Sequence, residues 1–448
     1  MTTTGAPVWE AAAPGLSGVL DDDARALAGY VAVGERALAG LPPKAGRDGP
    51  QRQAADRVHT ACRAARRTFL ARHVDAVYDL LTDGRTSHLR LPALVRAAAE
   101  RFPGLVPSTA QMAAERRHVQ ADKEGREIDQ GIFCAAVLRS ATAGRHLIDA
   151  MLRPTPRALG LLADFRRTGV AELDAVLVER RGHAAEVTFR NAHCLNAEDA
   201  GLIADLETAV DLTLLDDQVR VGVLRGGEVD HPRYRGRRVF SAGINLSELR
   251  DGAIPLLEFL LGRELGYVNK MCRGLLVDVA AGTWSDRTVA KPWLGVVDSF
   301  AIGGGMQLLL VLDRVIAEPD AYFSLPAAEE GIVPGLGNLR LTRLTGARLA
   351  RQVVLGGRRI PAASAEGRLI CDEVVEPQDM RDAIDRAVEE LGAPAVAANR
   401  RMLVLAEEPL DVFREYLAEF AYAQVLRAYS DDVLAKVERR WQRRGARR

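Results

Sequence analysis

The chain has 448 residues, and its 60 Lys+Arg balance its 60 Asp+Glu, so the formal net charge is zero. This balance argues against a protein built to bind a polyanion, and we expect no nucleic-acid partner. No apolar run is long enough to span a membrane, and the N-terminus lacks an apolar signal core, so we expect no membrane association. The five cysteines are scattered without a Cys-x-x-Cys pair, which suits reduced thiols and a cytoplasmic location.

The first part of the chain is predicted to be helical. Helical apolar patterns cover 52–81, 91–101, 109–120, 128–152 and 156–167. Asp21, Asp22 and Asp23 precede an earlier helical pattern, where carboxylates favour the helix dipole. A metal site is the alternative for these aspartates, but nothing nearby completes a ligand set. We expect residues 1–170 to form a helical N-terminal domain.

A run of three glycines, Gly303 to Gly305, separates an apolar run at 292–297 from another at 306–316. The first run predicts a buried strand and the second a buried helix. Glycines at such a junction permit positive φ and close approach by another molecule. They also leave N–H groups at a helix N-terminus, where negative charge is favoured. A tight turn packed against a neighbouring element is the alternative.

A second segment argues against the simple tight turn. A short predicted strand at 238–241 ends in Ala242-Gly243 and is followed by Ile244-Asn245. Further motifs are Leu195-Asn196-Ala197, the strand at 221–226 and the run Gly331-Ile-Val-Pro-Gly335. In this order, from about Leu173 to the C-terminus, they resemble the crotonase (enoyl-CoA hydratase/isomerase) superfamily.

The resemblance implies an α/β fold with a crotonase-like ββα superhelix core over 171–345. Predicted strands at 173–180 and 185–190 and a helix at 196–215 begin this core. Residues 346–448 would form a C-terminal helical region for assembly, with a long last helix at 410–439. In this family such helices pack on neighbouring subunits, which implies a homo-oligomer, a trimer or a hexamer.

The resemblance also implies an oxyanion hole. The N–H groups of Ile244 and Gly304 would bind the thioester oxygen of an acyl-CoA as it becomes an enolate. Flanking residues of both loops would contact the substrate: Ala242, Gly243, Asn245 and Gly303. Hydratases of this family carry two catalytic glutamates, but the matching positions here are Gln307 and Ala327. Neither side chain can act as a general base, so hydration is not expected.

The helical N-terminal part, Gln307, the missing second glutamate and an insertion bearing Arg263 resemble one branch of the superfamily. This branch holds cofactor-independent oxygenases of glycopeptide-antibiotic biosynthesis. It implies conversion of (3,5-dihydroxyphenyl)acetyl-CoA and O2 to 3,5-dihydroxyphenylglyoxylate and CoA. Gln307 would contact the substrate or peroxide, Glu198 a ring hydroxyl, and Arg263 would close over the ring. The alternatives are a backbone-bonded Gln307, a Glu198 that complements a helix dipole, and a surface Arg263.

A basic segment precedes the Ala-Gly loop. His231, Arg233 and Tyr234, with Arg235, Arg237 and Arg238, lie where this family binds CoA. Arginine and histidine donors suit phosphates, and Tyr234 suits contact with adenine or pantetheine. A solvated basic loop is the alternative.

No cofactor is expected. All eight histidines precede Ile244, so a metal site beside the glycine turn would need ligands from upstream. No Gly-x-Gly-x-x-Gly follows a predicted strand. We expect no metal, flavin or nicotinamide, with CoA as part of the substrate and O2 as cosubstrate. The other readings are a crotonase-type thioesterase, decarboxylase or isomerase, or a non-catalytic CoA-binding scaffold.

Overall fold

The computed structural model describes residues 11–277 and 288–445. The chain divides into two compact units, and each unit is built from separate segments of the sequence. One comprises Met1–Ala150, Ser247–Glu258 and Arg414–Arg448; the other comprises Met151–Leu246 and Phe259–Phe413. These units do not coincide with the three consecutive domains expected from the sequence, 1–170, 171–345 and 346–448.

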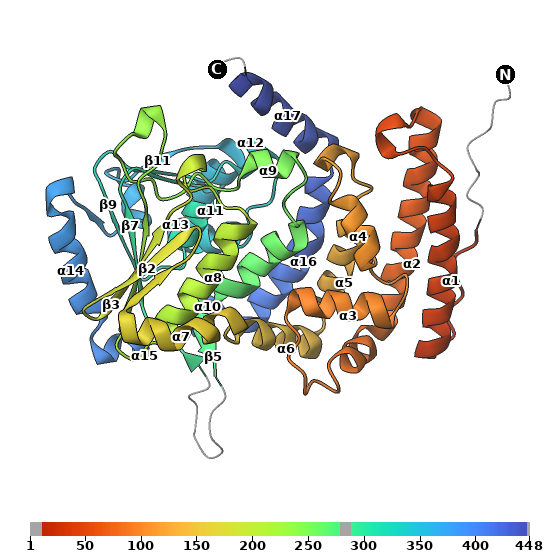
Figure 1. Cartoon of the computed structure of the whole chain (residues 1–448), viewed down its shortest axis with the longest axis horizontal. Helices are drawn as coiled ribbons and strands as arrows, with labels where there is room; N and C mark the ends of the chain where they lie inside the picture. The colour runs from red at the N-terminus through yellow and green to blue at the C-terminus, as the bar shows by residue number, and fades with distance from the viewer. Residues whose placement is uncertain (1–10, 278–287, 446–448) are drawn as a thin grey trace. The chain divides into compact units, whose positions relative to one another are not determined.

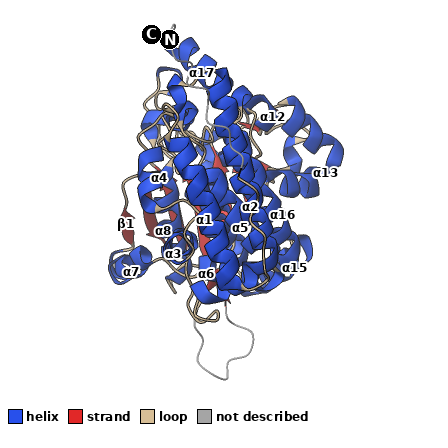
Figure 2. Cartoon of the chain, turned by 90° about the vertical axis from the view of Figure 1, so that its right-hand side faces the viewer, coloured by secondary structure: helices blue, strands red, loops and turns tan. Residues whose placement is uncertain are grey.

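The first unit is helical in its described part, and α1 and α2 lie side by side in both views (Figures 1 and 2). Its helices are α1 (Leu20–Ala39), α2 (Gly49–Leu81), α3 (Leu91–Arg101), α4 (Thr109–Glu115), α5 (Glu127–Arg139), most of α6 (Ala141–Leu152), most of α9 (Leu246–Arg250), the greater part of α16 (Leu410–Ala428) and α17 (Asp431–Gly445). The single helix predicted at 128–152 is two helices, because Ser140 leaves the helical conformation and its hydroxyl accepts a hydrogen bond from the N–H of Ala143 at 3.1 Å. The long helix predicted at 410–439 is likewise divided, between α16 and α17.

The second unit contains a seven-stranded sheet in the order β1-β2-β3-β4-β7-β9-β12. Its strands are β1 (Val170–Glu172), β2 (Val176–Arg181), β3 (Ala184–Phe189), β4 (Val221–Gly226), β7 (Trp293–Val297), β9 (Arg314–Ala317) and β12 (Glu373–Val374). The first three pair antiparallel and the rest parallel. In the central strands β4 and β7 every residue but Arg225 is buried, as expected for parallel strands covered on both sides.

A second sheet of three strands has the order β11-β10-β8, and a two-stranded sheet pairs β5 with β6. These strands are β5 (Leu275–Leu276), β6 (Thr288–Val289), β8 (Phe300–Ile302), β10 (Tyr322–Ser324) and β11 (Ile360–Pro361). The helices of this unit are α7 (Pro156–Thr168), α8 (Ala200–Leu215), α10 (Asn269–Arg273), α11 (Gly304–Leu309), α12 (Ala327–Glu330), α13 (Gly337–Gly356), α14 (Met380–Leu391) and α15 (Pro394–Glu407). The core lies where Ile384 and Ala387 of α14 pack against the sheet residues Val223 and Leu294.

Two local predictions around the glycine turn are wrong. The strand predicted at 238–241 is reduced to isolated bridges, from Arg238 to Glu228 and from Ser241 to Ala301. The helix predicted at 306–316 ends at Leu309, and Val315 and Ile316 lie in strand β9. Short apolar runs do not distinguish a buried strand from a buried helix, which explains the second error.

Candidate active site

The Ala-Gly loop and the glycine turn meet in space. Ser241 bridges Ala301, and the N–H of Ile302 donates to the carbonyl of Ser241 at 2.9 Å. Gly243 and Gly303 both have positive φ, 83° and 55°. A Cβ on Gly303 would lie 3.3 Å from the Cα of Gly243, so the two backbones approach closely because neither residue has a side chain.

The hydrogen bonds around this junction leave two N–H groups outside the pairing. The N–H of Glu198 donates to Gly243 O at 2.6 Å, and the N–H of Asn245 donates to Glu198 O at 2.8 Å. In this parallel bridge the N–H of Ile244 points away from Glu198. Gly304 is the first residue of α11, so its N–H has no acceptor within the helix. The Ala-Gly segment and the start of α11 are thus adjacent, whereas the role of their N–H groups stays a prediction.

Three predicted side chains come together beside this junction. Arg263 Nη2 donates to Glu198 Oε1 at 3.0 Å, and Arg263 Nη1 donates to Gln307 Oε1 at 3.2 Å. Glu198 and Arg263 are each 3% exposed, so the surface interpretation of Arg263 is wrong. Glu198 does not lie in the first turn of a helix either, because the next residue, Asp199, is the N-cap of α8.

All five N–H groups of the Arg263 guanidinium are used within the protein. The Nε donates to Glu198. The Nη2 donates to Glu198 and, at 2.9 Å, to the carbonyl of Gly304. The Nη1 donates to Gln307 and, at 2.7 Å, to Glu264. Burial lowers the pKa of Arg263, but Glu198, Tyr267 and Glu264 together outweigh burial and the pKa is raised. In this arrangement Arg263 orders the site residues rather than offering a free donor to a ring.

The structure adds two residues that the sequence analysis missed, Glu264 and Tyr267. Tyr267 is 1% exposed and its hydroxyl donates to Glu198 Oε1 at 2.8 Å. Burial and the nearby carboxylates raise its pKa, so it stays a hydrogen-bond donor. Both residues lie in a π-helical segment, Glu264–Val268, where the ordinary helical spacing misassigns the faces.

The carboxylate of Glu198 also lies against Gly304. A Cβ built on Gly304 would be 2.0 Å from Glu198 Oε2. The φ of Gly304 is not positive, so the need for glycine here comes from this contact and not from backbone conformation.

The basic segment lies beside β8, the strand that leads into the glycine turn. His231 Nδ1 accepts a hydrogen bond from the N–H of Arg233 at 3.2 Å. The ring of Tyr234 meets Phe300 edge-on at 5.2 Å, and the exposed guanidinium of Arg233 lies 5.5 Å from the centre of the Tyr234 ring. Arg237 differs, because it donates hydrogen bonds to Asp320 and Glu318, and these bonds raise its pKa. Arg237 is therefore a structural ion pair and not a free phosphate donor.

Across residues 11–277 and 288–445, no three His, Cys, Asp or Glu side chains gather closely enough to hold a metal ion. The same part of the chain has no helix with the length and hydropathy needed to cross a bilayer.

Known proteins match this chain over different lengths. The profile described as Enoyl-CoA hydratase/isomerase matches residues 281–407. A probable enoyl-CoA hydratase of Rhizobium meliloti (strain 1021) is 30% identical over 226 residues, which cover 50% of this chain and 78% of that protein. A solved enoyl-CoA hydratase from Mycobacterium avium subsp. paratuberculosis K-10 is 21% identical and gives a TM-score of 0.49 over 60% of this chain and 99% of that chain.

The chain belongs to the crotonase, or enoyl-CoA hydratase/isomerase, family, and its helix-rich α/β fold is of that class. Within the family, the (3,5-dihydroxyphenyl)acetyl-CoA 1,2-dioxygenase of Amycolatopsis orientalis is 58% identical over 415 residues. That match covers 93% of this chain and 95% of that protein, so it includes the helical N-terminal part.

Proposed function

We propose that this chain is a cofactor-independent dioxygenase that converts (3,5-dihydroxyphenyl)acetyl-CoA and O2 to 3,5-dihydroxyphenylglyoxylate and CoA. The observation that carries the proposal is the 58% identity, over 93% of the chain, to a dioxygenase of that name. Gln307 and Ala327 at the two glutamate positions of the hydratases support it, because they remove the groups that add water. The product belongs to antibiotic biosynthesis, and the enzyme is a cytoplasmic homo-oligomer.

The proposed chemistry starts at the junction of the two loops. The N–H groups of Ile244 and Gly304 stabilise the oxyanion that forms when the α-carbon loses a proton, at about 3 kcal/mol each. Ala242, Gly243, Asn245 and Gly303 shape the loops that hold the thioester. His231, Arg233 and Tyr234 contact the CoA nucleotide.

The electron-rich enolate passes an electron to O2, and the two radicals combine to form a peroxide at the α-carbon. The terminal peroxide oxygen attacks the thioester carbonyl and expels CoA as its thiolate. The cyclic peroxide then breaks its O–O bond as the second α-proton leaves, which gives the α-keto acid with both atoms of O2. Glu198 accepts a hydrogen bond from a ring hydroxyl, and Gln307 contacts the substrate or peroxide. Arg263 holds the side chains of Glu198 and Gln307 in place by hydrogen bonds.

The test is oxygen uptake by chelator-treated protein supplied with (3,5-dihydroxyphenyl)acetyl-CoA, with the product analysed by mass under ¹⁸O2. We expect uptake to be unchanged by chelation and two labelled oxygens in the product. Restoration only by added iron or copper would refute cofactor independence. Release of CoA without O2 would favour a thioesterase, and binding without turnover would favour a scaffold.

A further inference from the structure

Arg263 stands between two buried carboxylates, and one of them, Glu264, has no role in the chemistry above. Glu264 is 2% exposed, and its Oε1 accepts a hydrogen bond from Arg263 Nη1 at 2.7 Å. A Cβ on Gly335 would lie 2.2 Å from Oε1 of Glu264 and 2.9 Å from Oε1 of Gln307. Space for the Glu264 carboxylate therefore depends on a glycine at position 335, which also has a positive φ of 44°.

Glu264 connects the site to a second group of buried charges. Its Oε2 lies 3.6 Å from Arg340 Nη1, and Arg340 Nε donates to Glu408 Oε2 at 2.9 Å. Arg340 is 5% exposed and lies in α13, whereas Glu408 is 3% exposed and follows α15. Burial raises the pKa of Glu408, but Arg340 and Arg273 outweigh it, so Glu408 remains ionised. Acidic and basic side chains thus alternate along a series of five residues: Glu198, Arg263, Glu264, Arg340 and Glu408.

Removal of Glu264 would disturb the hydrogen bonds that the Arg263 guanidinium donates. Nε and Nη2 face Glu198 and Gly304, whereas Nη1 faces Gln307 and Glu264. Without Glu264, one buried N–H of Nη1 loses its acceptor and the guanidinium loses the contact that fixes its Gln307 side. Unpaired buried donors are costly, so the guanidinium would reorient and carry Glu198 with it.

We propose that Glu264 is a positioning residue that fixes the Arg263 guanidinium, and through it the orientation of Glu198 towards a hydroxylated ring. Acting through Arg263, Glu264 sets the preference for a dihydroxyphenyl over a phenyl ester. The proposal rests on the function proposed above for the same site.

The experiment compares the parent with Glu264→Ala and Glu264→Gln on (3,5-dihydroxyphenyl)acetyl-CoA and phenylacetyl-CoA. Dissociation constants are measured by anaerobic calorimetry, and kcat and KM by oxygen uptake. Glu264→Ala should weaken binding and kcat/KM for the dihydroxyphenyl ester by about 10- to 100-fold, the loss expected for a hydrogen bond to a charged group. Affinity for phenylacetyl-CoA should change less than about threefold.

Glu264→Gln retains an oxygen acceptor and should recover most of the loss, and it carries the test if Glu264→Ala does not fold. Glu264→Ala combined with Arg263→Lys should lose little beyond Arg263→Lys alone, because both act through one contact. Glu329→Ala, in an exposed glutamate of α12, is the matched control and should behave as the parent.

Equal losses for both esters, or no loss for either, would overturn the positioning role. Failure of the proposed function has a different signature: the parent would take up no oxygen with either ester. The anaerobic affinity ratio of the two esters would still report on Glu264 in that case.

Discussion

At the scale of single residues, Gly304 has no room for a side chain. In Gly304→Ala the new Cβ would lie 2.0 Å from Glu198 Oε2, so the carboxylate or the turn must move. A displaced turn moves the Gly304 N–H away from the oxyanion, and loss of one oxyanion donor costs about 3 kcal/mol, so we expect turnover to fall by about 100-fold or more. Anaerobic exchange of the α-proton with solvent measures enolate formation separately from oxygen chemistry.

Ile244→Ala is the control for that variant, because a half-buried side chain changes while the N–H remains. It should keep most of the activity. Exchange at the parent rate in Gly304→Ala would show that the glycine turn is not the oxyanion hole.

At the scale of elements, α8 and α10 are joined by one buried lysine. Lys270 Nζ lies 2.7 Å from Asp211 and 2.8 Å from Glu207, and Lys270 is fully buried. Lys270→Met would remove the buried positive charge that faces the fully buried carboxylate of Asp211, at a cost of about 3–5 kcal/mol. We expect a lower urea midpoint by circular dichroism, while Lys436→Met, in a half-exposed ion pair with Asp432, should change it little. An unchanged midpoint in Lys270→Met would mean that the cluster does not stabilise the fold.

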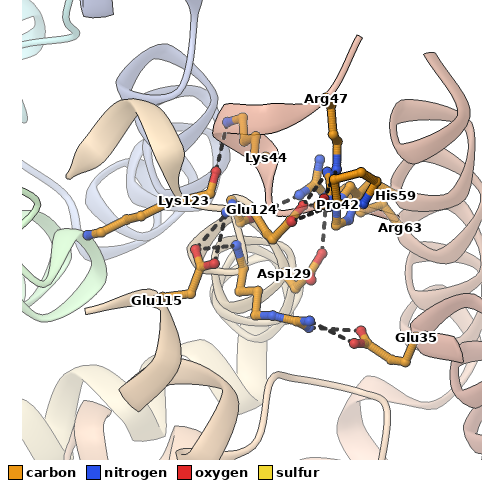
Figure 3. Close-up of polar contacts among 12 residues, drawn as sticks. Glu35, Pro42, Lys44, Arg47, His59, Arg63, Glu115, Lys123, Glu124 and Asp129 are labelled. Atoms are coloured by element: carbon orange, nitrogen blue, oxygen red, sulfur yellow. Dashed lines mark hydrogen bonds and ion pairs between the residues drawn. The ribbon is translucent and has the colours of Figure 1, made fainter. Parts of the chain in front are cut away.

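In the helical unit, Glu124 joins the segment before α5 to α2 and the residues just before α2. Figure 3 shows Arg47 and His59 directed at its carboxylate, with Arg47 Nη1 at 3.0 Å and His59 Nε2 at 3.1 Å. Burial raises the pKa of Glu124, but the hydrogen bonds from His59 and Arg47 outweigh it and lower the pKa to about 2.

Because the folded pKa lies below the usual 4.5, Glu124 stabilises the protein above pH 4.5 and loses this effect as the pH falls towards 2. Glu124→Gln should therefore cost about 1–2 kcal/mol at pH 7, discounted for partial exposure, and progressively less below pH 4.5. Thermal unfolding across pH 3–7 checks this. A difference between parent and variant that stays constant over this range would contradict the assignment.

At the scale of the whole molecule, the helical unit depends on residues from both ends of the chain. Arg414 Nη1 donates to the carbonyl of Leu138 at 2.6 Å, and the hydroxyl of Tyr429 donates to Glu127 Oε2 at 2.5 Å. A Cβ on Gly131 would lie 2.6 Å from Val425, so α5 and α16 are in close contact. The C-terminal helices are therefore partners of the N-terminal helices within one chain, and their expected role in assembly is an additional prediction.

Deletion of residues 1–150 should expose the apolar faces of α16 and α17, so the protein should aggregate. Size-exclusion chromatography measures this. The full chain should elute as a trimer or a hexamer. A deleted protein that is monodisperse and active would show that the helical unit is dispensable.

The sequence alone determined the features that backbone chemistry encodes locally. The run Gly303 to Gly305 indicated a turn that permits positive φ, which Gly303 adopts, and the helix predicted at 91–101 has the observed bounds. The sequence also shows Gln307 and Ala327 where hydratases of the family have glutamates, because this needs only the residue type at a motif position. The comparisons confirm the family that these motifs indicated.

Tertiary structure decided what depends on residues far apart in the chain. Arg263 and Glu198 are 65 positions apart, and only the fold shows that the arginine is buried and has all its donors used. Glu264 and Tyr267 escaped the sequence analysis because a π-helical segment rotates them away from the faces that ordinary helical spacing assigns. The sequence could not predict that α16 and α17 form one unit with the N-terminal helices. Local periodicity shows that a helix has an apolar face but not what covers it.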